Sequence, residues 1–407
     1  MAILFPHQVS ANSSRQIVCE ARRATLLDDG RPKYSFFNDT HQCYNAIMYP
    51  VLFPHGTNGY HDNLCSIVEE NGKFNKISLA MYVRYILMER STYYNYILRA
   101  RKLFQQYLVD MWATAEAQKL KWNKNNQTTL RADKYHVVRK AVASNNVGSS
   151  GAMVCPASYI GGQRWYDKYY QNAMALVRRY GKPTFFITMT LDVNCPEVQQ
   201  HLIPGMTPYD RADMLCRIFE LKKKHLIKMI VKDQVLGRSV ARLSVIEFQK
   251  RGAPHVHLLV WLEDFNPTPQ NIDNVISAEI PYSPKNESEE NSQRPFTSEK
   301  AYLQQEFHDL VMEKMVHGPC GPAYGRTNLG CCRNGTCKRN FPKPTRPHTE
   351  PGDGSNYPEY RRRSVDEGGH FGYKYYAGTR YEIDVSVHMT RLCVNIKPKT
   401  GSLRNMY

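Results

Sequence analysis

The chain has 407 residues, and its 54 Lys and Arg residues against 37 Asp and Glu residues give a formal net charge of +17. A composition that is 42% hydrophobic and 22% charged is ordinary for a globular protein, so general disorder is not the default expectation, and the length suffices for two or three cores. The positive charge favours a polyanionic partner. No segment approaches the about eighteen apolar residues of a membrane span, and no phosphate-binding Gly-x-x-x-x-Gly-Lys-Ser/Thr is present, so we expect a soluble intracellular protein without a membrane or nucleoside triphosphate partner.

The first part of the chain has a helical pattern. Apolar and aromatic residues at helical spacing predict two helices between Ile77 and about Trp122, broken near Ser91 and Thr92. Their expected packed face consists of Met81, Tyr85, Met88, Leu98, Leu103, Tyr107, Met111 and Trp112. A further helix is predicted over Arg131 to Ser144.

The middle of the chain alternates helical and strand patterns. A helix is predicted from about Trp165 to Tyr180, and Thr207-x-x-Asp210 resembles a capping box that opens a helix to about Lys232. Three strands are predicted at Thr184–Thr190, Leu243–Gln249 and His255–Leu262. This pattern indicates an α+β domain with an antiparallel sheet flanked by helices.

The remaining sequence is less periodic. Asn266 to Phe296 is predicted to be a loop with a short helix near Ile272 to Ser277, and Ser298 caps a helix to about Met315. We therefore divide the chain into a mainly helical region (1–150), a core (151–316), a Cys/His segment (317–347) and a basic, irregular tail (348–407).

The sharpest chemical feature is the predicted hairpin around two histidines. Strand residues alternate faces, so His255 and His257 point the same way. If Lys250 to Pro254 close the hairpin, Gln249 lies opposite His255 and Glu247 opposite His257, which supplies Glu247 or Gln249 as a third ligand. Such a set suits Mg²⁺ or Mn²⁺, although a His-x-His pair on a strand also occurs without any metal.

A second candidate metal site is a cysteine cluster. Cys320, Cys331, Cys332 and Cys337 fall within eighteen residues, with His317 just before them. We favour a tetrahedral structural Zn²⁺ site of Cys320, Cys332 and Cys337, with His317 or Cys331 as the fourth ligand. Free thiols in a loop are the alternative.

The hairpin also carries a resemblance. Glu247-Phe248-Gln249-Lys250-Arg251-Gly252-x-Pro254-His255-x-His257 resembles the signature of the Helitron replication-initiator domain, the helitron helicase-like domain of the HUH endonucleases. Further blocks resemble the family in the same order, from about Thr40 to Asp384: Phe104–Asp110, Pro156–Trp165, Gly181–Thr190, Ile272–Pro281 and His317–Gly321.

The resemblance implies a transposase of rolling-circle transposition that acts on single-stranded DNA, and hence a nuclear protein. In the family a tyrosine attacks a phosphodiester while a histidine-bound divalent metal polarises the scissile phosphate. Carried over, His255 and His257 are metal ligands, with Glu247 or Gln249 as the third. Arg164, Lys250 and Arg251 are phosphate contacts, or equally solvated surface charges.

Two departures from the family change the expected activity. Residues 385–407 diverge where the family has a paired-tyrosine helix, so we expect the nucleophilic tyrosine to be absent, and Leu191–Pro196 departs from the usual Cys-Asn-Pro-x-Trp-Pro sequence. We therefore expect metal and DNA binding with impaired or no nicking. A non-catalytic DNA-binding remnant or regulator and a zinc-stabilised RNA-binding protein are the alternatives.

Overall fold

The computed structural model divides the chain into two compact units, which are described separately. Unit 1 comprises Met1–Leu226, Ala241–Trp261 and Met406–Tyr407, and unit 2 comprises Ile227–Val240 and Leu262–Asn405. The residues that the structure describes are 17–20, 34–65, 75–90, 94–132, 153–250, 252–286, 298–352, 358–383 and 391–392. The four-part division of the sequence stays a prediction.

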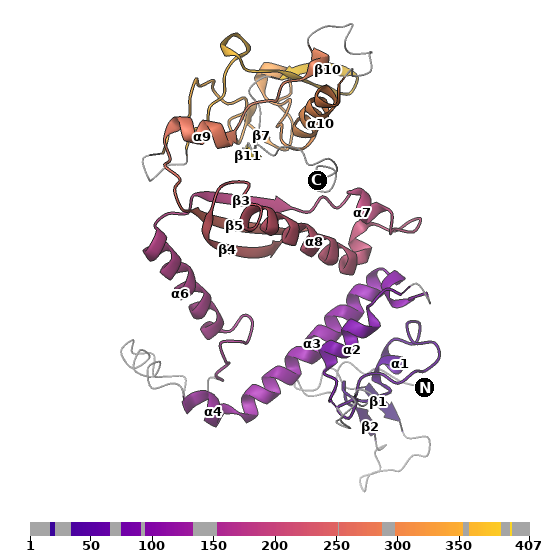
Figure 1. Ribbon diagram of the computed structural model, residues 1–407. Helices are drawn as coiled ribbons and strands as arrows, with labels where there is room; N and C mark the ends of the chain where they lie inside the picture. Colours follow the sequence, from indigo (N-terminus) through magenta and orange to yellow (C-terminus); the bar gives the residue numbers. More distant parts are fainter. Residues whose placement is uncertain are drawn as a thin grey trace. The chain divides into compact units, whose positions relative to one another are not determined.

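Unit 1 begins with a small hairpin and a helical layer (Figure 1). Strands β1 (Ile17–Glu20) and β2 (Tyr34–Phe37) pair antiparallel. The helices that follow are α1 (Tyr44–Met48), α2 (Leu79–Ile86), the short 3₁₀ helix Ile97–Arg99, α3 (Lys102–Asn125) and α4 (Gln127–Ala132). All of these except α4 contribute to a core that contains Tyr44, Leu79, Leu98, Phe104 and Tyr107.

The two helices predicted between residues 77 and 122 are confirmed as α2 and α3, but half of their predicted packed face is wrong. Leu98, Tyr107 and Met111 are buried, whereas Met81, Tyr85, Met88 and Trp112 are all more than half exposed. The physical reason is that α2 carries two sets of large side chains at helical spacing and packs the other one, Leu79, Tyr82, Val83 and Ile86. Most of the helix predicted over Arg131 to Ser144 lies outside the described residues.

The second part of unit 1 contains the predicted sheet. Helix α6 (Gln163–Tyr180) precedes β3 (Phe185–Thr190), and α7 (Pro196–Gln199), a 3₁₀ turn at Pro208–Arg211 and α8 (Ala212–Val231) precede β4 (Ser239–Phe248) and β5 (Pro254–Leu262). The strand order is β3-β5-β4, and β3 pairs antiparallel with β5 from Phe185↔Val260 to Thr190↔His255. The predicted α+β class with an antiparallel sheet and flanking helices is confirmed, as is the Thr207–Asp210 capping box.

The two faces of this sheet have different surroundings. One face is apolar, and Val256 of β5 packs with Leu215 and Phe219 of α8 in a core that also holds Leu191 and Val198. The side chains that alternate with it are more exposed: Phe186, Thr188 and Thr190 on β3 and His255 and His257 on β5. Alternation along the strands therefore places both histidines on the open face.

Unit 2 is built on short elements. In chain order these are α9 (Pro269–Val275), β6 (Ile276–Ser277), Pro284–Asn286, α10 (Glu299–Lys314), Pro322–Tyr324, β7 (Cys332–Arg333), β8 (Thr336–Cys337), Val365–Glu367, β9 (Gly372–Tyr376), β10 (Thr379–Ile383) and β11 (Arg391–Leu392). Ser298 caps α10 as predicted, because its Oγ accepts a hydrogen bond from the Ala301 N–H. The small core consists of Ile280, Val311, Met312, Val316 and Ile383.

The tail that we expected to be irregular is partly ordered within unit 2. Strands β9 and β10 form an antiparallel hairpin that buries Ile383 completely. The Arg363 guanidinium makes two 2.9 Å hydrogen bonds to the Glu279 carboxylate, which also accepts the Arg363 N–H. Basic residues of this segment therefore neutralise a buried carboxylate instead of all facing solvent.

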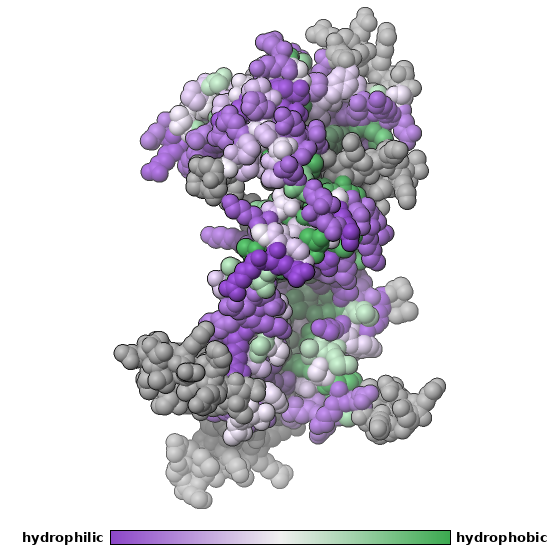
Figure 2. Space-filling model, turned by 60° about the vertical axis from the view of Figure 1, so that its left-hand side comes forward, coloured by the Kyte–Doolittle hydropathy of each residue, from purple (hydrophilic) through white to green (hydrophobic). Residues whose placement is uncertain are grey.

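The surface is mainly polar. Figure 2 shows a predominantly hydrophilic face with smaller hydrophobic areas between the polar residues. Among the helices of the described residues, none has both the length and the apolar character that crossing a bilayer requires.

Candidate functional site

The two histidines of β5 lie next to a tight turn that joins β4 to β5. The Gln249 N–H donates to the Ala253 carbonyl at 2.9 Å, and the Gly252 N–H donates to the Gln249 carbonyl at 2.7 Å. Gly252 has φ +90°, a conformation that glycine adopts without steric cost. The strands are therefore joined more tightly than by the five-residue connection Lys250 to Pro254 that we expected.

This turn corrects the predicted register. Pairing of Gln249 with Ala253 puts Glu247 opposite His255, not His257. The register differs from the predicted one by two residues, so every side chain keeps its face. Glu247 consequently still joins the histidines, while Gln249 lies beside Ala253 at the turn, and its role as a ligand stays a prediction.

Glu247, His255 and His257 converge on one point. The Glu247 Oε2 atom lies 3.1 Å from the Nε2 atom of His255 and 3.5 Å from that of His257. The three donor atoms lie within 4.8 Å of one another, as donors to a shared cation do. Glu247 is half exposed and both histidines are partly exposed, so the group is open to solvent and to a ligand.

The ring of His257 has two further contacts that the sequence analysis missed. The Thr188 Oγ1 lies 3.0 Å from its Nδ1, and the Phe186 ring stacks on it with centroids 5.2 Å apart. If Nδ1 carries the proton and donates to Thr188, the Nε2 lone pair is left for a metal. Thr188 faces His257 across the β3–β5 pair, so only the strand pairing, not local spacing, could have identified it.

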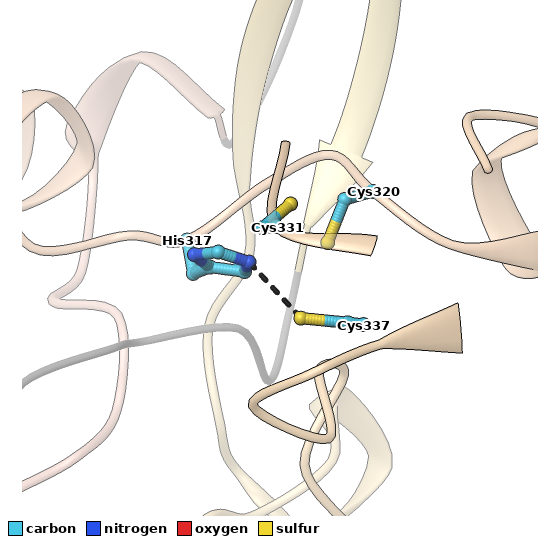
Figure 3. A group of neighbouring side chains, drawn as sticks. All are labelled: His317, Cys320, Cys331 and Cys337. Carbon is cyan, nitrogen blue, oxygen red and sulfur yellow. Dashed lines mark hydrogen bonds between the residues drawn. The ribbon is translucent and has the colours of Figure 1, made fainter. Parts of the chain in front are cut away.

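A second group of donors lies in unit 2, in the Cys/His segment (Figure 3). His317, Cys320, Cys331 and Cys337 offer donor atoms within 4.8 Å of one another, and the His317 Nε2 lies 3.3 Å from the Cys337 Sγ. One imidazole and three thiols match the tetrahedral donor set of a closed metal site. The arrangement is therefore a possible metal-binding cluster.

The membership of this cluster differs from the set that we favoured. The structure gathers both His317 and Cys331, which the sequence left as alternatives, and Cys332 is not among the gathered residues. The Cys332 Sγ lies 3.9 Å from the Cys331 Sγ and donates to the Arg326 carbonyl. Cys332 begins β7 and Cys331 precedes it, and the structure brings the Cys331 thiol, not the Cys332 thiol, into the cluster.

Burial and backbone contacts act in opposite directions on the thiols. Burial raises the pKa of the Cys320 thiol, and the Cys337 and Cys331 thiols raise it further. Burial also opposes ionisation of Cys337, but hydrogen bonds from the backbone N–H groups of Arg339 and Phe341 and from the Cys320 and Cys331 thiols together lower the pKa of that thiol. Cys337 is therefore the thiol of this pair that is more readily present as a thiolate.

The predicted phosphate contacts are in different situations. The Arg164 Nη2 donates to the Leu130 carbonyl at 3.3 Å, so this side chain already has a structural partner. Lys250 is exposed at the β4–β5 turn, and Arg251 lies outside the described residues.

Comparison with known proteins gives one family match. No curated protein matches the chain. Residues 82–260, somewhat less than half of the chain, match the family described as Helitron helicase-like domain at N-terminus. The matched part runs from α2 to β5 and contains Glu247, His255 and His257. The resemblance indicated by the sequence blocks is therefore confirmed over residues 82–260, and it suggests a transposon-derived family.

Proposed function

We propose that the protein binds single-stranded DNA and holds a divalent metal ion against its phosphate backbone, in the manner of an HUH endonuclease domain. The observation that carries this proposal is the convergence of Glu247, His255 and His257 on the open face of the sheet, inside the part that matches the family. The net charge of +17 favours a polyanion as the partner.

The donor set fits Mg²⁺ or Mn²⁺. Two imidazole nitrogens and one carboxylate oxygen leave other coordination positions for water and a phosphate oxygen. When bound, such an ion polarises a phosphoryl oxygen and makes the phosphorus easier to attack. His255, His257 and Glu247 hold the ion, and Thr188 keeps the His257 ring oriented.

The Cys/His segment has a structural role in this proposal. His317, Cys320, Cys331 and Cys337 hold a Zn²⁺ ion and so fix a segment whose own core is limited to a few residues such as Cys320, Cys337 and Phe341. Its basic residues Arg333, Lys338 and Arg339 are then presented to DNA.

The ancestral reaction is metal-dependent nicking and strand transfer in rolling-circle transposition, which places the protein in the nucleus. We expect nicking to be impaired here, because residues 385–407 diverge from the family sequence where its paired-tyrosine helix is expected. A DNA-binding remnant or regulator without catalysis, or a zinc-stabilised RNA-binding protein, would lack the metal-dependent contact with single-stranded DNA.

The test combines metal and DNA binding on the full chain. We expect Mn²⁺ to bind by calorimetry and to increase the affinity for a single-stranded oligonucleotide over RNA of the same sequence. The His255→Ala/His257→Ala variant should lose both effects while its circular dichroism stays unchanged. Equal binding of DNA and RNA with no Mn²⁺ effect would refute the proposal, and a covalent adduct in a denaturing gel would refute the expected loss of nicking.

A further inference from the structure

Helix α6 differs from the other long helices of unit 1 in leaving all its side chains accessible. None of its eighteen residues, Gln163–Tyr180, is buried, whereas α3 buries five. A helix with no buried residue normally has a polar surface, since exposed apolar stripes mark interaction sites. The side chains of α6 therefore indicate what it binds.

The helix is nevertheless held at both ends. The indole N–H of Trp261, a buried residue of β5, donates to the Gly181 carbonyl at 3.0 Å just after the helix. Near the other end, Arg164 donates to the Leu130 carbonyl at 3.3 Å. These anchors fix α6 within unit 1, and among the described residues no contact buries any side chain between them.

One face of α6 is aromatic. Large side chains recur at helical spacing and include five aromatic rings: Trp165, Tyr166, Tyr169, Tyr170 and Tyr180. Tyr166 is 57% exposed and Tyr170 is 62% exposed. The Trp165 ring lies 4.7 Å from that of Tyr169 and 5.0 Å from that of Tyr166, so the rings support one another as a platform.

Positive charge borders this platform. Between Gln163 and Lys182 the only carboxylate is Asp167, against five cationic side chains: Arg164, Lys168, Arg178, Arg179 and Lys182. The Lys168 ammonium lies 5.7 Å from the centroid of the Tyr169 ring, and the Arg179 guanidinium lies 5.4 Å from that of Tyr180. Aromatic rings edged by cations are complementary to unpaired bases on a phosphate backbone.

We propose that this aromatic face of α6 is a stacking platform for single-stranded DNA, a surface that extends the proposed function and rests on it. Bases stack on Tyr166 and Tyr170, while Lys168 and Arg179, which lie beside Tyr169 and Tyr180 on the flank of the helix, contact phosphates of the same strand. The helical rise between Tyr166 and Tyr170 is about 6 Å, whereas phosphates within one strand of a duplex are only about 3.4 Å apart along the axis, so the platform suits an extended single strand. The five cationic side chains against the single carboxylate of Asp167 favour a polyanionic strand as the occupant of this face.

The experiment measures the affinity of the full chain for labelled oligothymidylate by fluorescence anisotropy, without added divalent metal. Each of Tyr166→Ala and Tyr170→Ala should weaken binding about tenfold, because stacking on one aromatic ring contributes about 1–3 kcal/mol per base. Gln171→Ala is the matched control, since Gln171 is exposed on the same helix, outside the aromatic face. It should leave the affinity unchanged.

The salt dependence of the affinity distinguishes contacts to phosphates from stacking on bases. In Lys168→Ala/Arg179→Ala the slope of log affinity against log salt should fall by about 1.4, since each phosphate contact on a single strand contributes about 0.7. In Tyr166→Ala/Tyr170→Ala the slope should stay as in the wild type.

The possible failures are distinguishable. If the wild type binds no single-stranded DNA, the proposed function fails. If it binds, but the tyrosine variants match Gln171→Ala, the platform is refuted and the proposed function stands. A change in oligomeric state by light scattering, with unchanged DNA affinity in the tyrosine variants, would instead assign the face to contacts between copies and would also refute the platform.

Discussion

The two candidate metal sites of this protein are supported in opposite ways. Glu247, His255 and His257 lie within eleven residues on two adjacent strands of a sheet whose other face is packed on α8. His317 to Cys337 span twenty-one residues, and the regular structure between them is limited to one short turn and two two-residue strands. Protein packing therefore supports the first site, whereas we propose that the second depends on a bound metal ion.

The two sites also differ in how buried they are and in which donor atoms they offer. The histidine group is partly exposed and offers nitrogen and oxygen, while Cys320 and Cys337 of the second group are buried and offer sulfur. An accessible nitrogen and oxygen site can exchange water for substrate, and a closed sulfur site stabilises its surroundings. Metal loss should therefore affect binding at the first site and folding at the second.

The largest expected effect is loss of order in the Cys/His segment when its metal is removed. Apparent binding free energies of structural zinc in small domains are about 10–16 kcal/mol, and folding of the segment depends on that energy. Chelation, or Cys337→Ser, should greatly accelerate hydrogen exchange in residues 317–341 and leave the exchange of β3 and β5 unchanged. Cys332→Ser is the control, and we expect it to retain one zinc per chain by atomic absorption.

A second anchor of unit 2 needs no metal, and its removal should have the next largest effect. Burial alone would raise the pKa of the Glu279 carboxyl, but the hydrogen bonds from Arg363 hold it below its ordinary value. Glu279→Gln leaves Arg363 without its charged partner and should cost about 3 kcal/mol in the free energy of unfolding of unit 2. Because the folded pKa is the lower one, this contribution is present above the unfolded pKa of about 4.3 and is lost as the pH falls through the folded value.

Urea unfolding of wild type and Glu279→Gln at neutral and acid pH measures this contribution. The difference in stability should be largest near neutral pH and should shrink on acidification. An equal difference at every pH would mean that the Glu279 charge is not what stabilises unit 2.

The histidine site should respond with lost binding and little lost stability. His255→Ala/His257→Ala removes two of three ligands, so Mn²⁺ affinity should fall by at least about 100-fold, since loss of even an outer-shell partner costs about 10–100-fold. The melting temperature should change little because both side chains lie on the open face. If this variant unfolded, the histidine site would also be needed for folding, which would contradict the expected difference between the two sites.

Thr188 tests whether the sheet pre-organises this site. Thr188→Val keeps the shape of the side chain but removes the hydrogen bond to the His257 Nδ1, so Mn²⁺ affinity should fall about tenfold. Thr188→Ser should restore most of it. Calorimetric titration of Mn²⁺ into both variants and the wild type measures these affinities.

Some features of these sites could be predicted from the sequence and others could not, for physical reasons. Strand alternation is local, so the common face of His255, His257 and Glu247 could be predicted. The register was wrong by two residues because it depends on a turn in which Gly252 adopts positive φ. Thr188 was missed because its contact with His257 joins residues 69 positions apart.

In the Cys/His segment, the sequence could not predict which of two adjacent cysteines faces the other donors. Cys331 and Cys332 are adjacent, so their spacings to the other ligands differ by only one residue, and the direction of each side chain is what distinguishes them. A similar ambiguity affected α2. Two faces of this helix carry large side chains at helical spacing, and only one of them packs in the core of the first helices.

The smallest expected effect concerns Gln249, which sequence spacing offered as a ligand. It pairs with Ala253 at the turn, while the Glu247 carboxylate already contacts both histidines. Gln249→Ala should therefore change Mn²⁺ affinity less than about twofold, whereas Glu247→Gln should weaken it about tenfold or more, because a neutral amide attracts a cation less than a carboxylate does. If Gln249→Ala weakened binding as much as Glu247→Gln, the β4–β5 turn would have to rearrange when the metal binds, and this site would then resemble the Cys/His cluster in being shaped by its ion.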